Sequence, residues 1–205
     1  GYLETLQDQR DSVPAHWQRA LDHMQQQTER MQHLVDDLTL LSRLESRQTE
    51  LRPVPVAVDR LAARLCEDAR QLAPSHHVVT AGTPLVLLGS DSELHSAFGN
   101  LVSNAVRYSP PGSLVSLQWG EDARGAFFAV TDDGPGIAAM HIPRLTERFY
   151  RIDAGRGRAD GGTGLGLAIV KHALARHGAQ LEISSAPGKG STFTCRFPAA
   201  AVVHD

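Results

Sequence analysis

The residues best suited to chemistry lie in four short clusters in the second part of the chain. The first contains Asn100 and Asn104, which are four residues apart and therefore share one face of a predicted helix. A pair of amides can hold a hydrated Mg²⁺ ion and phosphate oxygens without adding negative charge. Two asparagines on an exposed helix are usually just solvated, so this cluster indicates a site only in combination with the others.

A second cluster, with the sequence Asp-Asp-Gly-Pro-Gly-Ile, occupies residues 132–137 after a predicted strand. A carboxylate at a strand end can accept a hydrogen bond from an exocyclic amine, and the glycines allow backbone to approach a flat ring closely. An acidic β-turn fits the same residues equally well.

The third and fourth clusters are rich in glycine. Residues 161–167 (Gly-Gly-Thr-Gly-Leu-Gly-Leu) lead into an amphipathic helix, where backbone N–H groups and the helix dipole can bind phosphate. No Gly-Lys-Ser/Thr follows, and no simple β-turn-α unit with a downstream acid surrounds the loop, which argues against a Walker A loop and a dinucleotide fingerprint. Residues 188–193 (Gly-Lys-Gly-Ser-Thr-Phe) fit a tight hairpin that enters the last strand.

The elements that position these clusters alternate between strands and helices. Strands are predicted at 78–80, 85–88, 114–119, 126–131, 181–184 and 192–197, and helices at 58–72, 91–108 and 165–177. Ser90 to Glu93 is typical of a capping box that opens the middle helix. This mixture predicts an α/β layered domain in which a mixed sheet carries helices on one face.

The first part of the chain has a different pattern. Apolar residues recur every three or four positions over 17–44, which predicts one helix of about 30 residues. So long a helix is expected to pack in a bundle or a dimer seam, although an unpaired helical linker is an alternative. Residues 2–6 predict the end of an earlier helix, residues 11–14 a turn, and residues 52–55 the end of the helical region.

Composition excludes several classes of protein. The 205 residues are 41% hydrophobic and 21% charged, which is typical of one or two soluble globular domains. A net charge of −3 gives no electrostatic reason to expect nucleic acid as a partner. The longest apolar runs are too short to span a bilayer. Cys66 and Cys195 lack CxxC spacing and predict reduced core thiols rather than a disulfide or metal pair.

The order of the motifs is similar to that of a known family. Asn-x-x-x-Asn, Asp-x-Gly-x-Gly, Glu-Arg-Phe-Tyr-Arg, Gly-x-Gly-x-Gly and Gly-Lys-Gly-Ser-Thr-Phe, found in this order across residues 100–193, resemble the N, G1, F and G2 boxes of the sensor histidine kinases. Residues 1–4, 27–31, 142–151 and 165–172 resemble the phosphate-regulon branch of that family.

The resemblance implies an α+β protein in two parts. Residues 1–48 would be a truncated helical hairpin of the dimerisation and histidine-phosphotransfer type, and residues 52–198 a catalytic domain with the Bergerat-type α/β sandwich. The family binds ATP with Mg²⁺. The ATP-binding residues that the resemblance implies are Asn100, Asn104, Tyr108, Asp132, Gly134, Gly136, Ile137, Phe149, Arg151, Gly162, Thr163, Gly164, Leu165, Gly166, Leu167 and Thr192.

Several of these residues would have defined roles by resemblance. Asp132 would receive the adenine amino group, and Thr192 would join a water-bridged network beside the adenine. Asn100 would bind Mg²⁺, and Arg151 would meet the phosphates together with the backbone of the Gly-rich loop. Residues 153–162 would form a mobile lid, with the ring of Phe149 buried at its base.

Two further side chains near the site are informative. Asp133 departs from the family, which usually has Asn after the adenine aspartate, and adds a negative charge near the site. In related ATPases of this fold a Glu that activates water takes the place of Asn100. Because Asn cannot take a proton, a hydrolytic ATPase or serine-kinase relative is disfavoured. A nucleotide-binding interaction module is the third hypothesis.

The acceptor of the phosphoryl group is expected outside this sequence. By resemblance it is a histidine in a Ser-His-Glu-Leu-Arg-Thr-Pro-like box upstream of Gly1, so we expect no catalytic residue here and no autophosphorylation. His16, His23 and His33 are interpreted as exposed or seam residues. The phosphoryl group would pass on to an aspartate of a response regulator.

The resemblance also implies an assembly and a location. In the full-length protein the helical hairpin would form a homodimer. This chain would be a cytoplasmic domain of a protein of the bacterial inner membrane, with membrane contacts made only by segments outside this sequence.

Overall fold

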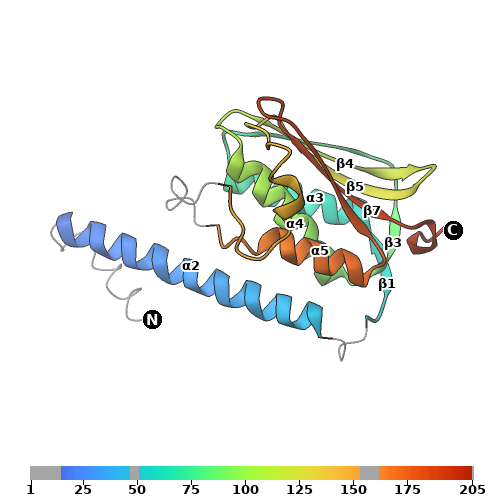
Figure 1. Ribbon diagram of the computed structural model, residues 1–205, viewed down its shortest axis with the longest axis horizontal. Coiled ribbons are helices and arrows are strands. Elements are labelled where there is room, and N and C mark those ends of the chain that lie inside the picture. The colour runs from blue at the N-terminus through green and yellow to red at the C-terminus, as the bar shows by residue number, and fades with distance from the viewer. Residues whose placement is uncertain (1–14, 47–50, 153–161, 205) are drawn as a thin grey trace.

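The computed structural model describes residues 15–46, 51–152 and 162–204. A long helix, α2 (Ala15–Glu45), lies beside a layered α/β unit formed by the rest of the chain (Figure 1). The predicted end of an earlier helix at 2–6 and most of the predicted lid fall outside the described residues. The described residues confirm the expected α+β architecture, in which a helical part precedes an α/β sandwich.

Five strands form a mixed sheet in the order β2-β4-β5-β7-β6. Their bounds are β2 (His77–Gly82), β4 (Leu114–Asp122), β5 (Gly125–Asp132), β6 (Gln180–Ser185) and β7 (Ser191–Phe197). Strand β2 runs parallel to β4, and the other pairs are antiparallel. Because side chains alternate across a strand, Leu117, Phe128 and Val130 all point to one buried face.

Three helices cover that face: α3 (Val58–Leu72), α4 (Asp91–Tyr108) and α5 (Gly166–Arg176) (Figure 1). The layers meet at Phe98 of α4, whose ring stacks on that of Phe128 with a centroid distance of 3.9 Å and meets Phe197 edge-on at 6.2 Å. Stacked aromatic rings add to the stabilisation that burial of their area gives. Cys66 and Cys195 are free thiols in this core, as expected.

The start of α4 is capped differently from the predicted capping box. The Ser90 hydroxyl accepts a hydrogen bond from the backbone N–H of Glu93 at 3.4 Å, as predicted. The Glu93 carboxylate, however, pairs with Arg176, and the Ser90 N–H donates to Nε2 of His177 at 3.0 Å. The capping box is therefore only half formed, and its second half is replaced by a tie between α4 and α5.

A small second sheet was not expected from the sequence. Strand β1 (Val54–Ala57) pairs antiparallel with β3 (Val86–Gly89). Two prolines in residues 52–55 argue against a strand, but Pro55 lies in a two-stranded sheet where an edge position tolerates the missing N–H. Two short 3₁₀ turns, Ile142–Arg144 and Ala199–Ala201, complete the described elements.

Helix α2 is buried only near its C-terminal end. Leu41 and Leu44 are 1% and 5% exposed, and α2 contacts α5 there. The remaining stripe is open to solvent, as at Trp17, Met24 and Met31. In the described part of the chain, no helix combines the length and the apolar character that crossing a membrane requires.

Candidate functional site

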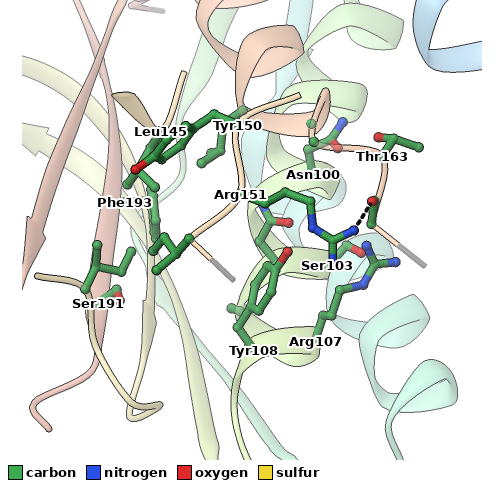
Figure 2. A pocket seen from close by; sticks show the side chains of 18 of the residues that line it. Asn100, Ser103, Arg107, Tyr108, Leu145, Tyr150, Arg151, Thr163, Ser191 and Phe193 are labelled. Atoms are coloured by element: carbon green, nitrogen blue, oxygen red, sulfur yellow. Dashed lines mark hydrogen bonds between the residues drawn. The ribbon is translucent and has the colours of Figure 1, made fainter. Parts of the chain in front are cut away.

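A cavity of about 580 Å³ brings the sequence clusters together. It lies between α4, the segment after β5, the stretches on either side of residues 153–161, and the start of β7. Figure 2 shows Ser191 and Phe193 at one side of this cavity and Asn100, Ser103 and Arg107 at the other. The lining residues that the sequence predicted are Asn100, Asn104, Tyr108, Asp132, Gly136, Ile137, Arg151, Gly162, Thr163, Gly164, Gly166 and Leu167.

Asp132 is a buried carboxylate at the end of β5, with 7% of its surface exposed. Burial raises the pKa of this carboxyl, and hydrogen bonds from the backbone N–H groups of Gly134 and Ser191 partly offset the shift. The Gly134 N–H lies 2.9 Å from Oδ1. Gly134 is not in the cavity lining, so it acts on the site through this bond.

The hydroxyl beside Asp132 belongs to Ser191 and not to Thr192. In the β5–β7 ladder Asp132 pairs with Ser191, whereas Thr192 pairs with Thr131 on the opposite face, where the two hydroxyls lie 3.0 Å apart. The predicted place of Thr192 beside the adenine is therefore corrected by one residue. A shift of one position in a strand moves a side chain to the other face of the sheet.

Asp133 also has a local structural role. Its Oδ1 accepts a hydrogen bond from the backbone N–H of Leu114 at 3.0 Å, which ties the segment after β5 to the start of β4. The charge of Asp133 contributes to the raised pKa of Asp132.

Gly136 is required where the segment after β5 passes over the turn between β6 and β7. It has a φ of 69°, and a Cβ there would lie 1.9 Å from the carbonyl oxygen of Ala186. The next residue, Ile137, donates its N–H to the Ser185 hydroxyl at 2.8 Å. The chain is thereby held against the wall of the cavity near Asp132.

Helix α4 contributes a complete polar face to the cavity. Asn100 and Asn104 are one turn apart, and Ser103, Arg107 and Tyr108 lie on the same side. Ser103 and Arg107 were not predicted from the sequence as site residues. The signal was present, because Arg107 follows Asn100 by seven residues, which is two helical turns.

The Gly-rich loop approaches this face closely. A Cβ on Gly166 would lie 2.5 Å from Oδ1 of Asn100, and one on Gly162 would lie 3.0 Å from Nη1 of Arg107. The Asn100 amide nitrogen donates to the Ser96 carbonyl at 2.9 Å, so its oxygen is the atom left on the loop side. Leu165 was predicted as a site residue, but its side chain is fully buried in the core and does not line the cavity.

The stretch before residue 153 contributes Arg151 and Tyr150. Arg151 donates from Nη1 to the Gly162 carbonyl at 3.0 Å, shown as the dashed line in Figure 2. Tyr150, which was not predicted as a site residue, is oriented by a 2.7 Å hydrogen bond between its hydroxyl and Nδ1 of His141. Leu145 and Phe193 were also missed.

Phe149 differs from expectation. Its ring is 57% exposed rather than buried, and its φ of 62° is unusual for a residue with a side chain. The Phe149 N–H donates to the Gly164 carbonyl at 2.9 Å, and a Cβ on Gly164 would meet the Phe149 backbone at 2.8 Å. The backbone of Phe149, rather than its ring, therefore contacts the Gly-rich loop.

Helix α2 also reaches the cavity, which the sequence did not predict. His33 and Asp37, one helical turn apart, belong to the lining. Asp37 accepts a hydrogen bond from the Thr163 hydroxyl at 2.8 Å. The interpretation of His33 as an exposed residue agrees with its exposure, but it lies at the edge of the site.

The side chains that line the cavity suit a ligand that has a flat ring at one end and negative charge at the other. A buried carboxylate at one end suits an amino group on a ring. Two guanidinium groups, two amides and a loop at the N-terminus of α5 suit phosphates at the other end. In the described part of the chain no group of three or more His, Cys, Asp or Glu side chains could hold a metal ion.

Comparisons with known proteins agree with this chemistry. A family model described as histidine kinase-, DNA gyrase B-, and HSP90-like ATPase matches residues 89–201, and one described as the His Kinase A (phospho-acceptor) domain matches residues 1–47.

Two relatives are named phosphate regulon sensor protein PhoR. The chain is 53% identical to the one from Pseudomonas aeruginosa over 98% of its own length, and 37% identical to the one from Haemophilus influenzae over 99%. It spans 46% and 48% of their lengths.

A solved structure, the mycobacterial sensor histidine kinase MprB, is also similar. It matches 71% of this chain and 97% of its own with a TM-score of 0.65 and 31% identity. From the two domain matches, these relatives and the cavity, the chain belongs to the sensor histidine kinase family.

Proposed function

We propose that this chain is the ATP-binding catalytic part of a two-component sensor kinase, together with one helix of its dimerisation unit. The division is the one expected from the sequence, with residues 1–48 in the first part and 52–198 in the second. The observation that carries the proposal is a single cavity with a buried carboxylate at one end and amides, arginines and a Gly-rich loop at the other. Similarity to proteins named for the phosphate regulon supports phosphate limitation as the signal.

The buried end of the cavity would hold the adenine. Asp132 would accept a hydrogen bond from the adenine amino group, because a buried carboxylate needs a donor to compensate its lost hydration. Gly136 and Ile137 would flank the ring on one side, and Tyr108 would flank the nucleotide nearer the phosphates. Ser191, at the position first assigned to Thr192, would extend the polar network beside Asp132.

The other end fits Mg²⁺ and the phosphates. The Asn100 oxygen faces a space that only glycine at position 166 leaves free, and Asn104 follows one turn later. These oxygens would hold Mg²⁺, which supplies charge neutralisation at the phosphates when bound. Arg107, Arg151 and the N–H groups of residues 162–166 would orient the phosphate oxygens.

The reaction would be transfer of the γ-phosphoryl group to a protein histidine. Asn100 cannot act as a base for water, so bound ATP is spared for that nucleophile. No Ser-His-Glu-Leu-Arg-Thr-Pro-like box occurs in this sequence, and we place the acceptor in the preceding helix of the bundle. An aspartate of a response regulator would then receive the group.

The exposed part of α2 would form the dimer. Met24, Met31 and Leu38 recur every seven residues and are 54%, 69% and 39% exposed, as expected for a stripe that a second bundle covers. We further propose that the described domain is cytoplasmic and that other segments of the full-length protein lie in the inner membrane.

The test is phosphoryl transfer from radiolabelled ATP. The chain should bind ATP with Mg²⁺, label itself negligibly and release little phosphate. A separate helix with the acceptor box should acquire an acid-labile, base-stable phosphoryl group, as phosphohistidine does. Rapid release of phosphate without labelling would instead support a hydrolytic ATPase. Binding of ATP without either reaction would support an interaction module.

A further inference from the structure

The C-terminal part of α2 is fixed to the catalytic domain by apolar contacts and by ion pairs. Leu41 and Leu44 are buried against α5. Glu45 pairs with Arg148, which precedes Phe149, and with Nε2 of His172 on α5 at 3.2 Å. These contacts place the preceding turns of α2 beside the phosphate end of the cavity, where Asp37 lies two turns before Leu44.

Asp37 brings a carboxylate directly onto the Gly-rich loop. Its Oδ2 accepts from the Thr163 hydroxyl at 2.8 Å, and that hydroxyl accepts in turn from the Leu165 N–H at 3.2 Å. The loop opens α5, whose N-terminal N–H groups favour an anion. A protein carboxylate therefore contacts the same loop that phosphate oxygens would bind.

The charges at this end define the consequence. Arg107 and Arg151 provide two positive charges within the cavity lining, and Asp37 is the acidic side chain that reaches the loop from α2. Like charges in a partly enclosed site repel more strongly than in water. ATP carries one more phosphoryl group than ADP, and in the nucleotide placement proposed above that group would extend farthest from the adenine, toward the loop.

We propose that Asp37 is a specificity-determining residue that lowers the preference of the cavity for ATP over ADP while α2 is docked. The proposal rests on the function proposed above, because it assumes that the cavity binds an adenine nucleotide. By linkage, ATP also weakens the docking of α2 more than ADP does, since the coupling between two binding events is reciprocal.

The chain offers a matched control on the neighbouring residue. Asp36 is exposed, and its Oδ1 accepts a hydrogen bond from Nε2 of Gln32, one turn earlier on α2, at 3.0 Å. Asp36→Asn and Asp37→Asn remove the same charge from the same helix. The first changes only the net charge, whereas the second also removes the carboxylate from the loop.

The experiment is calorimetry of MgATP and MgADP binding to the wild-type chain, D37N and D36N. D37N is expected to raise the affinity for ATP about tenfold and that for ADP about threefold or less. The reason is that the variant removes the short-range repulsion between the Asp37 carboxylate and the terminal phosphate. D36N should leave the ratio of the two affinities unchanged. Amide hydrogen exchange over residues 34–45 provides a second readout and should be faster with a non-hydrolysable MgATP analogue than with MgADP.

The outcomes separate this inference from the proposed function. An equal change for both nucleotides, no change, or the same ratio change in D36N overturns the role of Asp37 alone. If neither nucleotide binds to any of the three chains, the proposed nucleotide site fails, and the inference fails with it.

Discussion

The two ends of the cavity are built in different ways. The end at Asp132 is part of a continuous strand ladder, in which β5 and β7 fix the carboxylate beside Ser191 and Gly134 donates to it. The end at Arg107 is assembled from α4, the stretch at 150–152, the loop at 162–166 and α2, which are far apart in the sequence. In the function proposed above, recognition of the ring would therefore be set within the sheet, whereas recognition of the phosphates would depend on how separate elements meet.

This contrast predicts the largest effect at the strand end. Asp132→Asn should weaken binding of both ATP and ADP by about a hundredfold or more, because an amide presents one acceptor and a mismatched donor to the adenine edge. Calorimetry measures both affinities. Asp133→Asn is the control, because an amide oxygen can still accept from the Leu114 N–H and this change should have little effect. Comparable losses in the two variants would show that charge, rather than contact with the ring, matters at this end.

A smaller and more selective effect is expected at the phosphate end. Arg107→Gln removes a guanidinium from the α4 face and should weaken ATP binding about 10- to 30-fold, the lower part of the range expected for a hydrogen bond to a charged group, with a smaller loss for ADP. The ratio of the two affinities is the informative quantity. Arg64→Gln is the control. It removes the same positive charge, but from a surface ion pair with Asp91. Equal losses of ATP and ADP affinity in R107Q would place Arg107 away from the terminal phosphate.

What the sequence could predict follows the same division. The bounds of α3 and α4 agree to the residue, because each carries a clear helical period and α4 has its Ser90 cap. The predicted ATP-binding residues were expected to form one site. All of them except Gly134, Phe149, Leu165 and Thr192 line the cavity. Local patterns are sufficient where one element positions a residue.

The predictions that were wrong or missing concern residues whose position depends on contact with a second element. Ser191 and Thr192 are adjacent hydroxyl residues, and only the pairing of β7 with β5 shows which of them faces the cavity. The ring of Phe149 was expected to be buried, but its positive φ turns the chain so that its backbone meets Gly164 instead. The contact of Asp37 with Thr163 spans 126 positions in the sequence, and no local pattern encodes it.

The smallest predicted effect concerns stability and pH at the strand end. Burial raises the native pKa of Asp132, so the folded chain binds this proton more tightly than the unfolded chain does. The stabilisation linked to the proton is thus fully present below the ordinary pKa and is lost as the pH rises through the raised native pKa. Position 132 does not titrate in Asp132→Asn, so the free energy of unfolding of this variant should increase relative to that of the wild type as the pH rises through the raised native pKa of Asp132.

Urea unfolding of both chains without nucleotide, at several pH values, measures this difference, and Asp36→Asn controls for the change in net charge. The expected result is a variant that is relatively more stable at neutral pH but binds ATP much more weakly. Such a result would show that the site maintains a buried charge for the ligand at a cost in stability. A difference between the two chains that stays constant with pH, or moves in favour of the wild type, would mean that the hydrogen bonds from Gly134 and Ser191 outweigh burial. The strand end would then be stable without its ligand, and the contrast with the phosphate end would lie in geometry alone.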